Sequence, residues 1–221
     1  AHGAGDLREN EQRLESFASG AARGCCPACG GAEARTLFHA TDRLYRTTDR
    51  IFEVVECVSC RLIRLWPWPE PAELGRYYPA NYWFVPGDAP AARCEELYRR
   101  FVLGDHVRFV QRAIGNAQAG GLILDVGCGG GLFLRLLQEQ GHRVAGLDFS
   151  CDAACAAWRA NGVPVVCASL AHAPFPERSC SVVTMFHVLE HLYDPVLYLE
   201  AAGRLLLPGG SWWSRCRTPP A

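Results

Sequence analysis

Three residues near the end of the chain have side chains and a spacing suited to chemistry. His187, Glu190 and His191 form the pattern H-x-x-E-H within the stretch FHVLEH. Two histidines at this spacing on one helix can hold a catalytic zinc ion. A histidine or a carboxylate can instead accept a proton from a substrate near neutral pH. Because the apolar run SVVTMF leads directly into His187, the motif begins at a strand end, and we favour the second chemistry.

A second set of residues has the spacing of a metal site. Cys26 and Cys29 form one C-x-x-C pair, and Cys57 and Cys60 form another. Four thiolates satisfy a structural Zn²⁺ ion and leave no open position for a substrate. A segment of about 40 residues has too little core to fold well alone, so the metal would stabilise it. Free thiols or two disulfides are the alternative, and Cys25 is a neighbour that competes as a ligand.

The stretch LILDVGCGGG joins a short apolar run to a glycine-rich loop. Asp125, Gly127, Gly129 and Gly131 recur there as D-x-G-x-G-x-G. Glycines after a buried strand let the backbone approach a ligand closely, at the place where parallel α/β sheets bind ligands. About twenty residues later, Asp148 ends the run RVAGLD, where a carboxylate can accept hydrogen bonds from two ribose hydroxyls. A tight turn without a ligand is the alternative reading.

These residues need a scaffold, and from residue 121 the chain alternates between strand and helix patterns. One expected helix ends at Gly141, a second begins with Ser150 as its N-cap, and a third begins at Asp194 and Pro195. This alternation predicts an α/β fold, with a parallel sheet covered by helices on both faces. The expected strands are residues 122–126, 143–149, 163–168 and 180–186.

The earlier part of the chain has a different organisation. Residues 1–24 have the pattern of a polar leader, and residues 25–68 contain short β-type runs around the cysteine pairs. Residues 69–118 form a helical connector, in which Gly104 is expected to break the helix. The ligand-binding domain would then occupy residues 119–221.

Composition excludes several classes of protein. The 221 residues are 49% hydrophobic with a formal net charge of −1, as in ordinary globular proteins. No apolar run reaches the ~18–20 residues that span a bilayer, and the N-terminus lacks the apolar core of a signal peptide. The absence of a strongly basic half argues against a nucleic-acid partner. Although the chain has 12 cysteines, we expect it to be cytoplasmic and reduced.

Two long stretches together resemble the class I S-adenosylmethionine-dependent methyltransferases. They are LILDVGCGGGLFLRLLQEQGHRVAGLDFS and APFPERSCSVVTMFHVLEHLYDPVLYLEAAGRLLLPGG, and the resemblance covers residues 121–210. It implies a Rossmann-like sheet with S-adenosylmethionine across the carboxyl ends of its strands. By this resemblance the methionine part lies against the glycine loop, the ribose against Asp148 and the adenine near Ser169 and Leu170. The implied cofactor residues are Asp125, Gly127, Cys128, Gly129, Gly131, Asp148, Phe149, Ser169, Leu170 and His187.

The same resemblance assigns a role to the H-x-x-E-H motif. His187 would flank the methionine end of the cofactor, while Glu190 and His191 would orient or deprotonate the acceptor. The alternative is that Glu190 and His191 only hold the loop and cap the next helix. His172 stands where relatives often carry an acidic residue, which leaves the adenine contacts open.

The cysteine-containing segment resembles the zinc-ribbon-like domain of bacterial methyltransferases that act on nucleotide-linked sugars and similar small metabolites. The expected function is therefore methyl transfer to a small-molecule acceptor, for example a nucleotide-linked sugar. Ribosomal RNA methylation and a truncated, non-catalytic zinc-binding remnant are the alternatives. The acceptor atom (carbon, oxygen or nitrogen) and the oligomeric state stay open.

The end of the sequence departs from the resemblance. A fifth strand should follow LLLPGG, but SWWSRCRTPPA has the composition of a poor buried strand. A GC-rich back-translation read two bases out of frame gives Leu-Val-Val-Ala-Val-Pro-Asp, a good strand followed by a turn. The hypothesis is that a frameshift near residue 210 truncates the sheet after about strand five.

Overall fold

The computed structural model describes residues 24–70, 73–77, 90–114 and 121–215. The predicted leader lies outside these residues except for Gly24, and so does the end of the chain from residue 216. The chain divides into two compact units, each described by itself. The first unit is Ala1–Tyr82 with Tyr193–Val196, and the second is Trp83–Leu192 with Leu197–Ala221.

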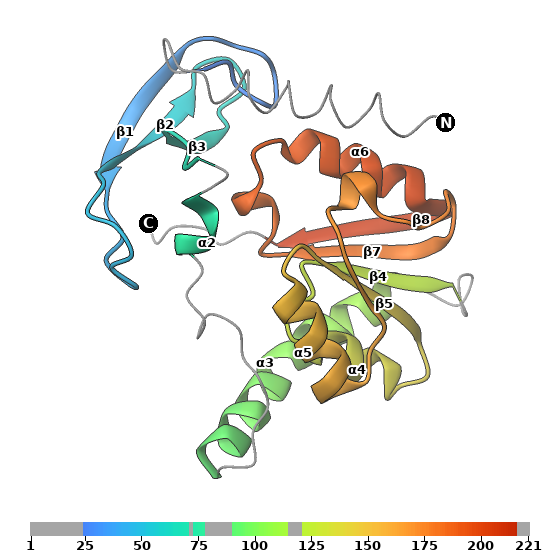
Figure 1. Cartoon of the computed structure of the whole chain (residues 1–221). Helices are drawn as coiled ribbons and strands as arrows, with labels where there is room; N and C mark the ends of the chain where they lie inside the picture. Colours follow the sequence, from blue (N-terminus) through green and yellow to red (C-terminus); the bar gives the residue numbers. More distant parts are fainter. Residues whose placement is uncertain (1–23, 71–72, 78–89, 115–120, 216–221) are drawn as a thin grey trace. The chain divides into compact units, whose positions relative to one another are not determined.

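The first unit contains the small β domain expected around the cysteine pairs. Strands β1 (Ala34–Ala40), β2 (Phe52–Cys57) and β3 (Ile63–Trp66) form an antiparallel sheet in the order β1-β2-β3 (Figure 1). The short helix α2 (Leu74–Tyr77) follows. Each C-x-x-C pair sits in a tight turn, closed by hydrogen bonds from the N–H of Gly30 to Cys26 O and from the N–H of Arg61 to Cys57 O. Gly30 and Arg61 both have positive φ, which these turns require.

The second unit contains the predicted parallel sheet. Its strands are β4 (Leu122–Val126), β5 (Arg143–Asp148), β6 (Val165–Cys167), β7 (Cys180–Phe186) and β8 (Leu206–Arg215). They lie in the order β6-β5-β4-β7-β8, and every neighbouring pair is parallel. The helices are α3 (Pro90–Ile114), α4 (Leu132–Gln138), α5 (Cys151–Asn161) and α6 (Pro195–Leu205), with 3₁₀ turns η3 (Leu170–His172) and η4 (Leu189–His191). The predicted α/β class with a Rossmann-like sheet is confirmed.

Helices cover both faces of this sheet, as the alternating pattern predicts (Figure 1). One core cluster joins α3, α4 and α5 to one face through Val110, Leu134 and Ala157. The other joins α6 and η3 to the opposite face through Ala202 and Leu170. The strands are apolar on both faces because both faces are covered, which explains their near-continuous hydrophobic runs.

Three expectations about local structure are wrong. Gly104 does not break the connector helix, because α3 runs unbroken from Pro90 to Ile114. A helical glycine costs only about 1 kcal/mol relative to alanine, which the packing of this helix offsets. The chain is also not fully reduced, since Cys151 and Cys167 form a disulfide.

The segment after LLLPGG is the third correction, because it does form a strand. β8 pairs in parallel with β7 through residues Ser211 to Arg215 and lies at an edge of the described sheet. Its ten residues are half-buried or exposed, and the Trp213 ring packs edge-on against Phe109 at 4.8 Å between centroids. An edge strand tolerates tryptophans and glycines that a central strand would not. The frameshift, a statement about the coding DNA, stays a hypothesis.

In the described part of the chain, no helix is both long enough and apolar enough to cross a membrane.

Candidate functional site

The glycine loop between β4 and α4 has the backbone conformation that only glycine adopts easily. Gly127, Gly129 and Gly131 all have positive φ, at 71°, 51° and 75°. A Cβ on Gly127 would lie 2.5 Å from Cγ2 of Val188, and one on Gly131 would lie 2.6 Å from Cγ2 of Val163. Val188 and Val163 therefore pack against the loop, and a side chain at Gly127 or Gly131 would have to displace them.

Asp148 closes the loop from the end of β5. Its carboxylate accepts hydrogen bonds from the N–H of Gly129 and the N–H of Ser150, both at 2.9 Å. Burial raises the pKa of the carboxyl group, while these two N–H groups act against that shift. Each carboxylate oxygen keeps a further lone pair. The sequence spacing predicts that Asp148 lies near the glycine loop, and in the structure Asp148 is hydrogen-bonded to Gly129.

Asp125 is buried at the end of β4, where it contacts β7. Thr184 Oγ1 donates to Asp125 Oδ1 at 2.6 Å. The Asp125 pKa is raised to about 7, mainly by burial and also by the nearby Asp148 charge, while the Thr184 hydroxyl acts in the opposite direction. Sequence reasoning missed Thr184, although a polar residue inside the apolar run CSVVTMF was a usable signal.

Cys128 faces away from the loop. A Cβ built on Gly146 of β5 would lie 2.6 Å from Cys128 Sγ, so this sulfur fills the space that the glycine leaves open. Burial also raises the pKa of the Cys128 thiol. Only the backbone of Cys128 is therefore available to a ligand in the loop, and its side chain belongs to the core.

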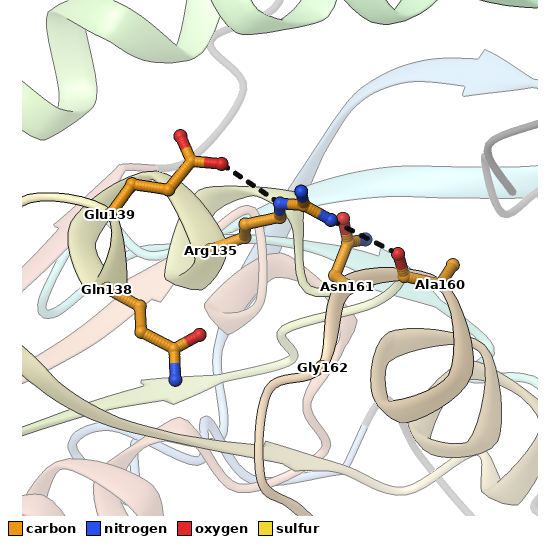
Figure 2. Close-up of a pocket in the computed structure, with 6 residues that line it drawn as sticks. All are labelled: Arg135, Gln138, Glu139, Ala160, Asn161 and Gly162. Carbon is orange, nitrogen blue, oxygen red and sulfur yellow. Dashed lines mark hydrogen bonds and ion pairs between the residues drawn. The ribbon is translucent and has the colours of Figure 1, made fainter.

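A pocket between α4 and the end of α5 lies outside the predicted site. Figure 2 shows its lining, Arg135, Gln138, Glu139, Ala160, Asn161 and Gly162. Arg135 donates to Glu139 Oε1 at 3.0 Å and to the Ala160 carbonyl at 3.3 Å (Figure 2). Asn161 Nδ2 donates to the carbonyl of Gly130 at 2.6 Å, so it supports the glycine loop from the helix side. Nothing in the sequence around Asn161 signals this role.

The predicted ribose and adenine residues lie at the ends of β5 and β6. Phe149 is 60% exposed, whereas Leu170 is buried in the core. Ser169 Oγ and His172 Nδ1 are hydrogen-bonded at 3.1 Å. His172, which stands where the resemblance implies an acidic residue, is thus hydrogen-bonded to Ser169, a predicted adenine residue.

The H-x-x-E-H motif forms a short turn at the carboxyl end of β7. His187 has a φ of 58°, and its Nδ1 lies 3.4 Å from Oε1 of Glu190. Glu190 and His191 belong to the 3₁₀ turn η4, so the two histidines do not share the α-helix that a zinc peptidase needs. The structure pairs His187 with Glu190 and leaves His191 exposed.

His106 and Arg215 complete this end of the sheet and were missed from the sequence. The His106 ring of α3 packs edge-on against Phe186 at 4.8 Å, and Arg215 Nη1 lies 3.4 Å from its Nε2. The Arg215 carbonyl accepts from the N–H of His187 at 2.6 Å. Burial lowers the pKa of His106, and the positive charge of Arg215 lowers it further, while a backbone hydrogen bond to Val102 acts in the opposite direction. No sequence pattern relates His106, on a helix, to Arg215, at the end of a strand much later in the chain.

The four predicted metal ligands converge in the first unit. The Sγ atoms of Cys26, Cys29, Cys57 and Cys60 all lie within 4.8 Å of one another, and among the described residues this is the one cluster able to hold a metal. Cys26 Sγ lies 3.5 Å from Cys60 Sγ, and Cys29 Sγ lies 3.6 Å from Cys57 Sγ. A tetrahedral Zn²⁺ with bonds of about 2.3 Å needs sulfurs about 3.8 Å apart, so the donor set fits.

The environment of this cluster lowers the pKa of one thiol and raises the pKa of Cys26 and Cys60. The backbone N–H of Cys60 is the main cause that lowers the pKa of Cys57 to about 6, whereas burial raises the pKa of Cys26. A thiolate is the form that binds a metal. The exposed Cys25 lies outside the cluster.

The parallel sheet and its glycine loop define a Rossmann-like ligand-binding domain. The methyltransferase domain model matches residues 98–213, just over half of the chain. The chain therefore belongs to the methyltransferase domain family.

Individual relatives match over a similar region. A probable S-adenosylmethionine-dependent methyltransferase of Mycolicibacterium smegmatis is 33% identical over 59% of this chain and 43% of its own length. A ubiquinone biosynthesis O-methyltransferase of Sodalis glossinidius is 34% identical over 56% of this chain and 53% of its own. The chain thus spans about half the length of these relatives.

Solved structures are similar over the same part. The geranyl diphosphate C-methyltransferase of Streptomyces coelicolor, in complex with S-adenosyl-L-homocysteine, is 21% identical, with a TM-score of 0.45 over 50% of this chain and 42% of that one. A putative methyltransferase of Bacillus halodurans is 20% identical, with a TM-score of 0.46 over 52% of each chain.

Proposed function

We propose that this protein transfers a methyl group from S-adenosylmethionine to a small-molecule acceptor. The observation that carries the proposal is the hydrogen bond between the Gly129 N–H and Asp148, which joins the glycine loop to the end of β5. In a parallel α/β sheet, this is where a nucleoside-containing ligand binds. Membership of the methyltransferase domain family supports the choice of this ligand.

In this proposal, different parts of the cofactor bind at the ends of different strands. The loop glycines and Asp125 hold the methionine part, and the free lone pairs of Asp148 accept from the ribose hydroxyls. Phe149, Ser169 and Leu170 flank the adenine. Methyl transfer is a displacement in line with the sulfonium, so the protein supplies mainly proximity and alignment.

His187, Glu190 and His191 form the acceptor side in the same proposal. His187 Nδ1 lies 3.4 Å from Glu190 Oε1, within ion-pair distance, although this nitrogen has no hydrogen-bond partner in the described part of the chain. Where the acceptor loses a proton on methylation, His191 is exposed and suited to remove it, with Glu190 orienting the acceptor. His187 lies nearest the cofactor's methionine end.

The first unit is proposed to hold one structural Zn²⁺ on Cys26, Cys29, Cys57 and Cys60. The fit of the four sulfurs to a tetrahedron supports this ion. When bound, the zinc would supply folding stability to a three-stranded sheet that has little core of its own.

The acceptor is proposed to be a small organic molecule, with a nucleotide-linked sugar as one candidate. The relatives named for ubiquinone biosynthesis and for geranyl diphosphate methylation support a small acceptor and widen the choice. An acceptor screen should therefore include catechols and prenyl diphosphates beside nucleotide sugars.

Calorimetric titration with S-adenosylhomocysteine tests the cofactor assignment. We expect saturable binding by the wild type and loss of binding in Asp148→Ala. Asp152→Ala is the matched control, because Asp152 is an exposed carboxylate in the first turn of α5. A folded wild type that binds no S-adenosylhomocysteine, or an Asp148→Ala variant that binds as tightly as Asp152→Ala, would contradict the proposal.

A further inference from the structure

A disulfide borders the candidate cofactor site. It joins Cys151, the first residue of α5, to Cys167, the last residue of β6, with the two Cα atoms 5.3 Å apart. Both cysteines are exposed. Thiol–disulfide exchange needs access for an attacking thiolate, and this bond provides it.

The cross-link ties together the two segments that flank Asp148. On one side, the N–H of Ser150 donates to the Asp148 carboxylate at 2.9 Å, and Cys151 follows directly. On the other, the N–H of Ala168 donates to the Asp148 carbonyl at 3.0 Å, directly after Cys167. The Cys167 sulfur also lies 3.6 Å from the carbonyl oxygen of Phe149.

These two segments carry both predicted walls of the ribose and adenine site. Phe149 leaves β5 on one side of the disulfide, and Ser169 and Leu170 leave β6 on the other. The Phe149 side chain itself is largely exposed. The covalent bond therefore adds a second tie between the walls, beside the parallel β5–β6 pairing of Asp148 with Cys167.

We propose that Cys151 and Cys167 form a redox-exchange site whose disulfide form binds the cofactor more tightly than its dithiol form. This inference rests on the proposed function, because it concerns the site assigned there to S-adenosylmethionine. A preorganised site loses less conformational entropy on binding, so opening the cross-link weakens affinity without removing a ligand contact.

The exchange partner belongs to the class of low-molecular-weight thiols and disulfides. In the forward direction, a small-molecule disulfide accepts two electrons and two protons from the cysteine thiols and leaves as two thiols, while the Cys151–Cys167 bond forms. In reverse, two small-molecule thiols reduce the protein disulfide and leave joined to each other. Each direction passes through a mixed disulfide.

The test compares S-adenosylhomocysteine affinity in glutathione buffers poised oxidised or reduced. We expect wild-type Kd to rise by about 5- to 10-fold on reduction, as for a site that must be ordered on binding. Cys151→Ser and Cys167→Ser should have the higher Kd of the reduced wild type in both buffers. Cys155→Ser is the matched control, because Cys155 is a free, exposed cysteine one turn along α5, and it should respond like the wild type.

Two further measurements separate the possible outcomes. Peptide mapping by mass spectrometry follows the Cys151–Cys167 bond, and the zinc content of each sample shows whether the four-cysteine cluster has changed. A Kd that differs by less than about 2-fold between fully reduced and fully oxidised wild type would overturn the inference, while loss of binding in Asp148→Ala would still uphold the proposed function. Absence of binding in both buffers would overturn both.

Discussion

Thr184 of β7 donates a hydrogen bond to Asp125 of β4 at 2.6 Å, in the buried middle of the parallel sheet. A buried carboxyl group is costly unless it is hydrogen-bonded or neutral. This contact gives Asp125 a partner, yet burial still raises its pKa to about 7. The end of the central strand therefore carries a carboxyl group that titrates near neutral pH.

Asp125 should make protein stability depend on pH. Its folded-state pKa lies above the ordinary value of 3.8, so the folded protein binds more protons than the unfolded chain between pH 4 and pH 7. The stability that the protonated group contributes is complete below pH 4 and is lost as pH rises through 7. We expect Asp125→Asn to be more stable than the wild type at pH 8, by on the order of 2 kcal/mol.

Urea unfolding of both proteins at pH 5 and pH 8 measures this effect. Asparagine keeps an oxygen to accept from Thr184, so the comparison isolates the charge. Equal differences between the variant and the wild type at the two pH values would show that Asp125 does not titrate in this range.

Gly127→Ala should disrupt the glycine loop through one identifiable clash. The new methyl group would lie 2.5 Å from Cγ2 of Val188, in addition to the strain of a positive φ. We expect a loss of about 2–4 kcal/mol of stability and at least tenfold weaker S-adenosylhomocysteine binding. Gly141→Ala is the control, because Gly141 also has positive φ but has open space around its Cβ position.

The double variant Gly127→Ala, Val188→Ala tests the cause. Removing the valine methyls should recover part of the lost stability, leaving a loss closer to that of Gly141→Ala. No recovery would mean that the clash with Val188 is not what excludes a side chain at position 127.

If the four cysteines hold Zn²⁺ as proposed, Cys60→Ser should weaken its binding. Its sulfur lies 3.5 Å from that of Cys26, and three thiolates with one hydroxyl hold Zn²⁺ less tightly than four thiolates. We expect about one zinc per chain in the wild type and in Cys25→Ser, measured by mass spectrometry of the metal, and less than half of that in Cys60→Ser. Equal zinc loss in Cys25→Ser and Cys60→Ser would contradict the assigned ligand set.

His106 should be largely uncharged at neutral pH. Burial and the positive charge of Arg215 lower its pKa from 6.5. We expect an NMR titration of its ring protons to have a midpoint below 6.5, and Arg215→Gln to move that midpoint upward because a nearby positive charge is removed. Arg112→Gln, on the exposed side of the same helix, is the control and should leave it in place. A midpoint unaffected by Arg215→Gln would show that the two side chains do not interact in solution.

The features that the sequence alone determined are local. Periodic apolar runs predict β4, β5 and β7 because alternating strands and helices need continuous buried faces. The glycine loop and Asp148 are predictable because their spacing reflects one strand–loop–helix–strand unit. The two C-x-x-C pairs are predictable because each lies within one short turn.

Local pattern failed where the environment of a residue decides the outcome. SWWSR makes a poor central strand, yet β8 forms because an edge position leaves Trp213 half-buried against Phe109. Gly104 weakens a helix in isolation, yet α3 passes through it. Propensity is a weak term, and packing outweighs it.

The tertiary structure alone decided which distant residues meet. It placed Thr184 on Asp125, Asn161 on Gly130, His106 beside Phe186, and joined Cys151 to Cys167. At least one member of each pair looks ordinary in the sequence: Thr184 is a polar residue in a strand, Asn161 ends a helix, His106 lies on a helix, and Cys151 and Cys167 are two cysteines among twelve. Such contacts depend on how strands are ordered in the sheet and which helix covers which face, and those arrangements arise only when the whole core is packed.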